Sequence, residues 1–436
     1  MEKTSVLQHP ATKKAGLPPI VIIGVLFFIF GFITWLNGTL IPYLKIACEL
    51  SSDTQSYLVA TAFFIAYTVM ALPSSWVLRK TGYKKGMAIG LLVMALGAAI
   101  FIPAAKIRSF DMFLGGLFII GTGLALLQTA SNPYAAILGP MESAAKRISI
   151  MGICNKVAGI LAGLIFGYIA LKDADVFEQK LLGMSVAAKD AALDELASRV
   201  INPYIIITVL LLVLSLVVLK SSLPDINDHD NEAEDTDAGI HQKASIFQFP
   251  HLLLGVLTLF LYVGVEVMAG DTIISYGKAL GIPLSTARYF TQATLGCMLL
   301  GYIIGIICIP KYISQAKALM LCAVSGAVFT VLAVFTTGYA SILFIALLGL
   351  SNSLMWPAIW PLAIDGLGKF TKTASALLVM AIAGGAILPL LYGALVDLLS
   401  VSFDKATASS QAYWIMLPCY LFIWFYAVKG HSIRRK

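Results

Sequence analysis

The sequence predicts an all-α membrane protein in which twelve transmembrane helices form two pseudo-symmetric six-helix bundles. Of its 436 residues, 59% are hydrophobic and 12% are charged, and the mean hydropathy is +0.88. Soluble domains carry about a quarter charged residues, so this composition excludes a soluble protein. Apolar stretches of about 20 residues span a bilayer, and one strongly polar segment divides the stretches of this chain into two sets.

Twelve apolar stretches of spanning length follow one another along the chain. The predicted spans are residues 19–44, 55–78, 86–105, 111–139, 148–171, 202–220, 251–276, 286–310, 316–337, 341–364, 374–399 and 411–429. The first six precede the polar segment and the last six follow it. We therefore predict an N-terminal bundle over residues 1–220 and a C-terminal bundle over residues 249–436.

The polar segment, residues 221–248, is predicted to be a flexible cytoplasmic linker. Between Lys220 and Lys243 it holds seven acidic residues and neither Lys nor Arg, which is the composition of a solvated tether. Its two histidines, His229 and His241, are not expected to bind a metal.

The distribution of Lys and Arg predicts that both termini lie in the cytoplasm. An even number of spans places both termini on one side, and most Lys and Arg residues fall on that side, as cytoplasmic loops require. The net charge of +7 reflects this anchoring and gives no support to nucleic-acid binding. The first apolar segment is too long for a cleavable signal. We expect a monomeric, multi-pass protein of the plasma (bacterial inner) membrane, surrounded by the lipid bilayer.

The six cysteines lie in or at the ends of the spans and form no CxxC pair. Small core residues are a better interpretation than a disulfide framework or a metal cluster. These cysteines are Cys48, Cys154, Cys297, Cys308, Cys322 and Cys419.

Two pairs of spans indicate kinship between the halves. The fifth and eleventh spans each carry three residues at four-residue spacing, which places them on one helix face for close packing. They are Gly159, Gly163, Gly167, Gly385, Pro389 and Gly393. The fourth and tenth spans each hold an Asn near a Pro, namely Asn132 with Pro133 and Asn352 with Pro357. Two six-helix repeats around a polar cavity is the design of secondary transporters; the alternative is chance, because Gly and Pro are common in membrane helices.

Polar side chains inside the apolar spans indicate a ligand cavity. Such groups are costly in hydrocarbon and usually face a cavity. On five helices they are Asn37, Gln128, Asn132, Asn155, Lys156, Glu266 and Gln292. Gln128 and Asn132 are four residues apart and share one helix face, and Glu266 follows Tyr262 by four residues.

This set of side chains suits a polyol. Each amide offers two donors and an acceptor, and aromatic side chains can stack on the apolar face of a sugar ring. The predicted substrate-binding residues are Asn37, Gln128, Asn132, Asn155, Trp35, Tyr262, Gln292, Asn352 and Trp356. The alternative is that the amides only tie helices together. No metal site and no cofactor is expected.

Several motifs together resemble the fucose:proton symporter family of the major facilitator superfamily, most closely its glucose/galactose branch. The motifs are "FFIFGFITWLNGTLIPYLK", "GLALLQTASNPYAAILGP", "FLYVGVEVMAG" and "AIDGLGKFTKTASALLVMAIAGGAILPLLYGALVD". The loop "SSWVLRKTGYKKG" is similar to the superfamily signature between the second and third helices, without its usual acidic residue.

The resemblance implies a major facilitator fold, rocking-type alternating access, and import of a monosaccharide coupled to a cation, H+ or Na+. The sugar would be a hexose such as glucose, galactose, mannose or N-acetylglucosamine. Asn37, Gln128, Asn132 and Asn155 fall where the family handles sugar. Glu266 matches the glutamate frequent in the glucose/galactose branch.

Two departures concern coupling. The fucose symporter has an acid directly after the first-helix Asn, where this chain has Gly38, and a glutamate where this chain has Gln128. Neither residue titrates, so transport is coupled to Na+, to a proton held elsewhere, or to nothing.

Lys156 is the unusual charge, because a lysine buried without a partner is unfavourable as a cation. We expect it to pair with Glu266, the acid most deeply placed in a span, and we assign this pair to coupling. The alternative is that Lys156 snorkels or meets only backbone carbonyls. Asp271, Asp365 and Asp397 are predicted nearer the span ends, within reach of water.

Other functions fit the sequence less well. A drug or metabolite exporter of the same fold should have a more apolar cavity, and an uncoupled sugar uniporter would need no ionisable pair. The chain is not expected to be an enzyme, because its five histidines avoid the span interiors. No charged ring indicates a channel.

Overall fold

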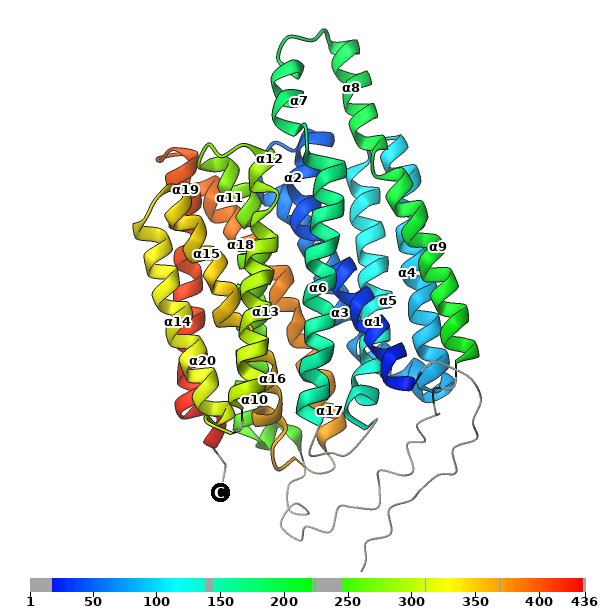
Figure 1. Cartoon of the computed structure of the whole chain (residues 1–436), viewed down its shortest axis with the longest axis vertical. Coiled ribbons are helices and arrows are strands. Elements are labelled where there is room, and N and C mark those ends of the chain that lie inside the picture. The colour runs from blue at the N-terminus through cyan, green and yellow to red at the C-terminus, as the bar shows by residue number, and fades with distance from the viewer. Residues whose placement is uncertain are drawn as a thin grey trace, which may run out of the picture.

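The computed structural model describes residues 18–137, 144–221, 223, 245–309, 311–367 and 370–433, and every regular element in these ranges is helical. Twelve helical segments are long and apolar enough to cross a membrane, six before and six after the acidic segment. The predicted number of spans is therefore confirmed. They run side by side along the long axis of the molecule (Figure 1).

The first six spans form the N-terminal half. They are α1 Pro19–Trp35 with α2 Asn37–Ala47, α3 Asp53–Thr81, α4 Tyr83–Lys106, α5 Phe110–Ile137, α6 Ala144–Leu171 and α9 Ile201–Lys220. The first span is interrupted at Leu36, immediately before Asn37. Within this half α4 packs on α5 and α9, and α1 packs on α6.

The last six spans form the C-terminal half, and most of them are built from two pieces. The helices are α10 Pro250–Asp271, α11 Ile273–Ala279, α12 Leu284–Ala287, α13 Phe290–Cys308, α14 Gln315–Phe335, α15 Gly338–Asn352, α16 Met355–Ile364, α17 Thr371–Met380, α18 Gly384–Leu399, α19 Lys405–Ala412 and α20 Met416–Val428, with the 3-10 turns η4 Ile246–Gln248, η6 Ala381–Ala383, η7 Tyr413–Ile415 and η8 Gly430–Ser432. The eleventh span is interrupted by the 3-10 turn η6, and directly after it Gly384 lies so close to the Phe260 carbonyl that there is no room for a side chain.

Two short helices, α7 Ala174–Leu181 and α8 Val186–Ser198, project beyond the bundle at one end (Figure 1). We call this end the hairpin end. The Tyr43 hydroxyl anchors α8 to α2 by donating to the Leu196 carbonyl at 2.8 Å. Arg108 binds Asp190 and Asp194 of α8 at 3.1 and 2.7 Å. These contacts dock the two helices on the bundle as a helical hairpin.

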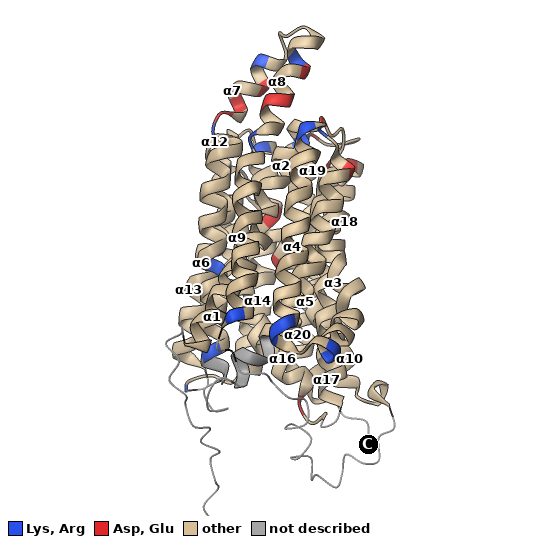
Figure 2. Cartoon of the chain, turned by 90° about the vertical axis from the view of Figure 1, so that its right-hand side faces the viewer, with Lys and Arg blue, Asp and Glu red and all other residues tan. Residues whose placement is uncertain are grey.

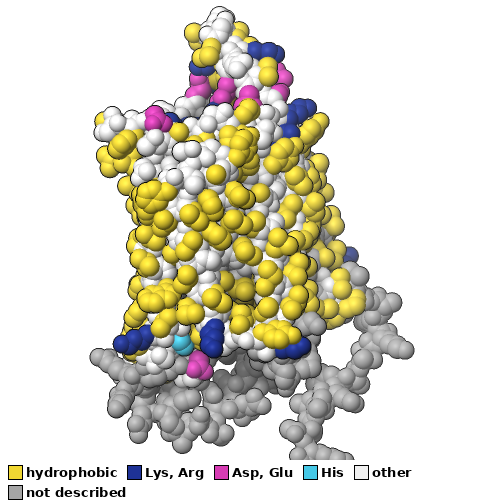
Figure 3. Space-filling model, turned by 60° about the vertical axis from the view of Figure 1, so that its left-hand side comes forward, with side chains coloured by type: hydrophobic (Ala, Val, Ile, Leu, Met, Phe, Trp, Pro, Cys, Tyr) yellow, Lys and Arg dark blue, Asp and Glu magenta, His cyan; other side chains and the backbone are white. Residues whose placement is uncertain are grey.

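Charge and hydrophobicity divide the surface as a bilayer would require. Charged positions cluster at the two ends of the bundle, with few between them (Figure 2). A broad belt of hydrophobic side chains covers the visible face between these ends (Figure 3). The seventh span, α10, is the most enclosed, with 67% of its apolar window buried, against 28% for the sixth. Most side chains on α10 therefore meet the protein interior rather than lipid.

At the hairpin end the two halves touch along their small-residue faces. Gly163 of α6 lies so close to the Gln292 amide of α13 that a Cβ would overlap it. A Cβ on Gly393 of α18 would lie 2.6 Å from the Tyr57 ring of α3. The close packing predicted for the fifth and eleventh spans is confirmed, and its partner in each case is a helix of the other half.

Two carboxylates at the hairpin end each cap a helix of the opposite half. Asp397 of α18 accepts backbone N–H bonds from Asp53 and Thr54 at the start of α3, at 2.9 and 2.8 Å. Asp175 of α7 accepts N–H bonds from Leu284 and Ser285 at the start of α12, at 2.7 and 3.0 Å. Exposed N–H groups and the positive end of the helix dipole favour a carboxylate there. These caps join the two halves at the hairpin end.

Candidate functional site

A cavity of about 160 Å³ lies between the two halves, near the middle of the bundle. Helices α1, α3, α5 and α6 line it from the N-terminal half, and α10, α13 and α16 from the C-terminal half. Its polar and amphipathic lining residues are Thr34, Trp35, Tyr67, Gln128, Asn155, Lys156, Tyr262, Glu266, Tyr302 and Trp356. A mostly apolar wall with a few converging polar groups is typical of a small-molecule site.

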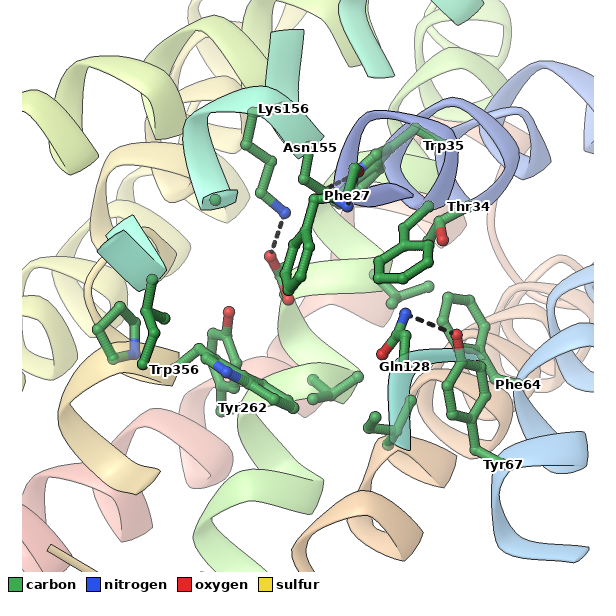
Figure 4. A pocket seen from close by; sticks show the side chains of 18 of the residues that line it. Phe27, Thr34, Trp35, Phe64, Tyr67, Gln128, Asn155, Lys156, Tyr262 and Trp356 are labelled. Carbon is green, nitrogen blue, oxygen red and sulfur yellow. Dashed lines mark hydrogen bonds and ion pairs between the residues drawn. The ribbon is translucent and has the colours of Figure 1, made fainter. Parts of the chain in front are cut away.

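The charged feature of the cavity is an ion pair between Lys156 of α6 and Glu266 of α10. The Lys156 Nζ lies 2.9 Å from Glu266 Oε1, and the two side chains are only 8% and 11% exposed. The same ammonium lies 4.4 Å from the centroid of the Trp35 ring, where the ring face attracts a cation. The predicted partnership of Lys156 is present, and it joins the two halves across the cavity (Figure 4).

Two amides of the N-terminal half face the same space. Gln128 Nε2 donates to the Tyr67 hydroxyl at 3.0 Å. Asn155 accepts from Trp35 Nε1 at 3.4 Å and donates to the Phe27 carbonyl at 3.5 Å. Both Asn155 bonds are long for N–H···O contacts, so this amide can turn toward a ligand at small cost.

Aromatic rings form the facing wall. Figure 4 shows Tyr262 and Trp356 on the side of the cavity opposite Gln128 and Tyr67. The Tyr262 and Trp356 ring centroids lie 6.5 Å apart, and Trp356 packs on Trp360 at 5.4 Å. Amides on one wall and aromatic faces on the other can bind the polar edge and the apolar face of one sugar ring.

Three of the predicted substrate-binding residues lie outside the cavity in this conformation. Asn37 is buried at the start of α2, and its amide has no hydrogen-bond partner among the described residues. The Gln292 amide nitrogen donates to the Arg288 and Tyr289 carbonyls, one turn earlier in the chain. Asn352 accepts a bond from the Tyr420 hydroxyl at 2.9 Å, within the C-terminal half. The Asn132 side chain lies outside the described residues, although α5 continues through this position.

The position of Asp271 corrects a prediction. The sequence placed it near a span end within reach of water, but it is 1% exposed. The physical reason is that α2 and α13 cover the end of α10 when the halves touch. A Cβ on Gly38 of α2 would lie 3.2 Å from Asp271 Oδ1 and 3.1 Å from Thr291 Oγ1.

Sequence reasoning missed two tyrosines of the cavity. Tyr67 and Tyr302 both line it. Tyrosines of membrane proteins concentrate at the two interfaces, whereas these two lie within the second and eighth spans. Their depth was the signal that could have identified them.

Three comparisons place the chain among known proteins. The model of the Major Facilitator Superfamily matches residues 23–390. The glucose/galactose transporter of Brucella abortus biovar 1 (strain 9-941) is 34% identical over 409 residues, which are 93% of this chain and 92% of that protein. The L-fucose-proton symporter of Escherichia coli (strain K12) is 29% identical over 393 residues, 88% of each chain.

A solved structure agrees with these sequence matches. The crystal structure of a Major Facilitator Superfamily transporter, FucP, in the outward conformation matches with a TM-score of 0.71 and 27% identity. The match covers 96% of this chain and 99% of that chain. The fold and the pairing of two six-helix halves are therefore shared over nearly the whole length.

Proposed function

This chain belongs to the fucose:proton symporter family of the major facilitator superfamily, and from that premise we propose that it imports a hexose together with a cation. It is an integral multi-pass membrane transporter rather than an enzyme. The single observation that carries the proposal is the inter-half cavity in which Gln128, Asn155 and two tryptophans surround the Lys156–Glu266 ion pair.

The cavity supports a monosaccharide as substrate. Its amides and hydroxyls converge from both halves, and Trp35 and Trp356 supply aromatic faces. A drug exporter would favour a more apolar wall. The relatives named as glucose/galactose transporters support glucose, galactose or a close relative, such as mannose or N-acetylglucosamine, as the first sugars to test.

The conformation corresponds to one end-state of alternating access. The halves touch at the hairpin end, while the cavity lining reaches Phe27 and Ile148 toward the opposite end. Both termini and the linker, residues 221–248, would lie in the cytoplasm, since Lys and Arg are concentrated there. With that orientation in the plasma membrane the hairpin end faces outward, and the state is inward-facing.

The Lys156–Glu266 pair is suited to coupling because its partners belong to different halves. In a buried ion pair, each charge is compensated only while the oppositely charged partner is present. Protonation of Glu266, or a cation beside it, would loosen the pair and allow the halves to separate around a bound sugar. Binding and reorientation then depend on one another, as symport requires.

Uptake into proteoliposomes tests this function directly. Purified protein should accumulate one sugar of a hexose panel when an inward H+ or Na+ gradient is imposed, with the two gradients applied separately. Equilibrium exchange of labelled sugar, without any gradient, reports substrate binding and reorientation alone. Exchange without accumulation under either gradient would establish a uniporter, and no exchange with any hexose would refute a sugar substrate.

A further inference from the structure

Asp271, the last residue of α10, is a buried carboxyl group that does not line the sugar cavity. It is 1% exposed, and its Oδ2 has no hydrogen-bond partner within the part of the chain that the structure describes. The charged group that acts on it is Glu266, a like charge on the same helix. Glu266 is already bound to Lys156 at 2.9 Å, so that lysine is committed elsewhere.

The helices packed around Asp271 present neutral groups to it. Position 38 of α2 is a glycine, and a Cβ there would lie 3.2 Å from Asp271 Oδ1. Thr291 of α13 donates its hydroxyl to the Gly270 carbonyl at 2.6 Å. From α3, the Tyr57 phenol lies close enough to interact electrostatically with Asp271.

Two polar residues that follow Asp271 in the chain, Thr272 and Arg288, bind other groups. Arg288, at the start of the eighth span, directs its guanidinium to the Gly167 carbonyl at 3.3 Å and to the Tyr289 hydroxyl at 2.7 Å. Thr272 of the following turn bonds the Tyr413 hydroxyl at 2.6 Å. Among the described residues, Asp271 therefore lies against neutral side chains, and the charge that acts on it is the like charge of Glu266.

An ionised carboxylate cannot be held in such surroundings without a large desolvation cost. The halves meet at Asp271, since Gly38 of α2 belongs to the N-terminal half, whereas Asp271 and Thr291 belong to the C-terminal half. When the halves separate there, water reaches the carboxyl group and stabilises its ionised form. The protonation of Asp271 and the closure of this end are thus linked.

We propose that Asp271 binds a proton while the hairpin end is open and that this end closes only over the neutral acid. The proton adds to one carboxylate oxygen, COO− + H+ giving COOH, and no other bond changes. Gly38 favours the closed state because a Cβ there would crowd Asp271 Oδ1, at 3.2 Å. The inference rests on the proposed function, in which a cation drives import, and assigns the outer loading step to this residue.

Distance measurements between the halves test the linkage. Spin labels at the exposed positions Ile107 and Ala340 report opening of the hairpin end, after the six native cysteines are replaced. In the otherwise unchanged protein, acid should favour the closed state, with the closed-to-open ratio changing about tenfold per pH unit where the open state ionises. In Asp271→Asn, which imitates the neutral acid, this end should still open and close, with a closed-to-open ratio that does not change with pH.

Matched variants test whether the pH dependence of closure comes from Asp271 itself. Asp190→Asn removes an exposed carboxylate from α8 at the same end and should keep the pH dependence. Asp271→Glu keeps an acid and should keep a one-proton dependence with a shifted midpoint, even if Asp271→Asn folds poorly. In proteoliposomes Asp271→Asn should lose proton-driven accumulation while equilibrium exchange survives.

Three results would overturn the inference. The first is pH-dependent closure that persists unchanged in Asp271→Asn. The second is closure of the wild-type protein driven by Na+ and insensitive to pH. The third is an infrared carboxylic-acid C=O band of the closed state that is the same with and without Asp271. Absence of any sugar exchange by the wild-type protein would refute the proposed function instead, and the distance measurement would still decide the role of Asp271.

Discussion

The cap that Asp397 places on α3 should set the balance between the closed and open states of the hairpin end. Asp397→Ala removes the acceptor of three hydrogen bonds, from the Asp53 and Thr54 N–H groups and from the Thr54 hydroxyl at 2.6 Å. When this end opens, α18 moves away from α3 and the same donors turn to water. Asp397→Ala therefore destabilises the closed state and leaves the free energy of the open state unchanged.

The magnitude follows from the kind of cap that is lost. Replacing an N-cap acceptor by Ala costs about 1 kcal/mol, within a range of roughly 0.5–2 kcal/mol. Asp397 is 28% exposed, so water compensates part of the charge-assisted bonding and the estimate stays near 1–2 kcal/mol. The closed-to-open ratio should fall about 5- to 30-fold, since 1.4 kcal/mol corresponds to tenfold.

The same pair of spin labels, at Ile107 and Ala340, measures this ratio from the populations of short and long distances. Asp175→Ala removes the related cap on α12 and should shift the ratio in the same direction by a similar amount. The two caps lie on different helix pairs, so the double variant should show the sum of the two free-energy changes. Asp404→Ala, which removes a cap within the C-terminal half, is the control. Unchanged populations in both single variants would show that the caps follow closure without stabilising it.

The remaining predictions concern the cavity and one cysteine. Gln128→Ala should weaken hexose binding by at least several-fold, because a direct hydrogen bond contributes roughly 0.5–1.5 kcal/mol; unchanged affinity in equilibrium binding would reduce Gln128 to a packing role. Glu266→Gln should lose gradient-driven accumulation while sugar exchange partly survives, because Lys156 loses its charged partner. Glu178→Gln, which breaks an exposed ion pair, is the control. Undiminished accumulation by Glu266→Gln would show that Glu266 has no role in coupling. Burial raises the pKa of Cys48 to about 11. Its alkylation by a maleimide at pH 7 should therefore be roughly a hundredfold slower than that of an ordinary thiol, and it should accelerate as the pH rises from 8 to 10. Fast labelling at pH 7 in a variant that keeps Cys48 as its single cysteine would contradict this.

The cavity shows how far polar residues in apolar spans identify a binding site. Gln128, Asn155 and Glu266 stood out because polar groups are rare and costly there, and the structure places all three around one cavity. Asn352 was also predicted to bind substrate, but it bonds Tyr420 inside its own half. A lone amide in a span satisfies the same rule whether its partner is a ligand or a neighbouring helix, so the sequence could not separate the two.

The sequence by itself determined the number of spans, and it indicated the division into two halves and the partnership of Lys156 with Glu266. Hydropathy is summed along the chain, so twelve apolar stretches are visible without any knowledge of packing, and a buried cation needs a buried anion wherever it lies. Only the tertiary structure decided that Asp271 is sealed, that Asn37 lies away from the cavity, and that Asp397 caps a helix of the other half. Each of these depends on how closely the two halves approach at the hairpin end. That approach differs between states of the same chain, and so no local pattern in the sequence can encode it.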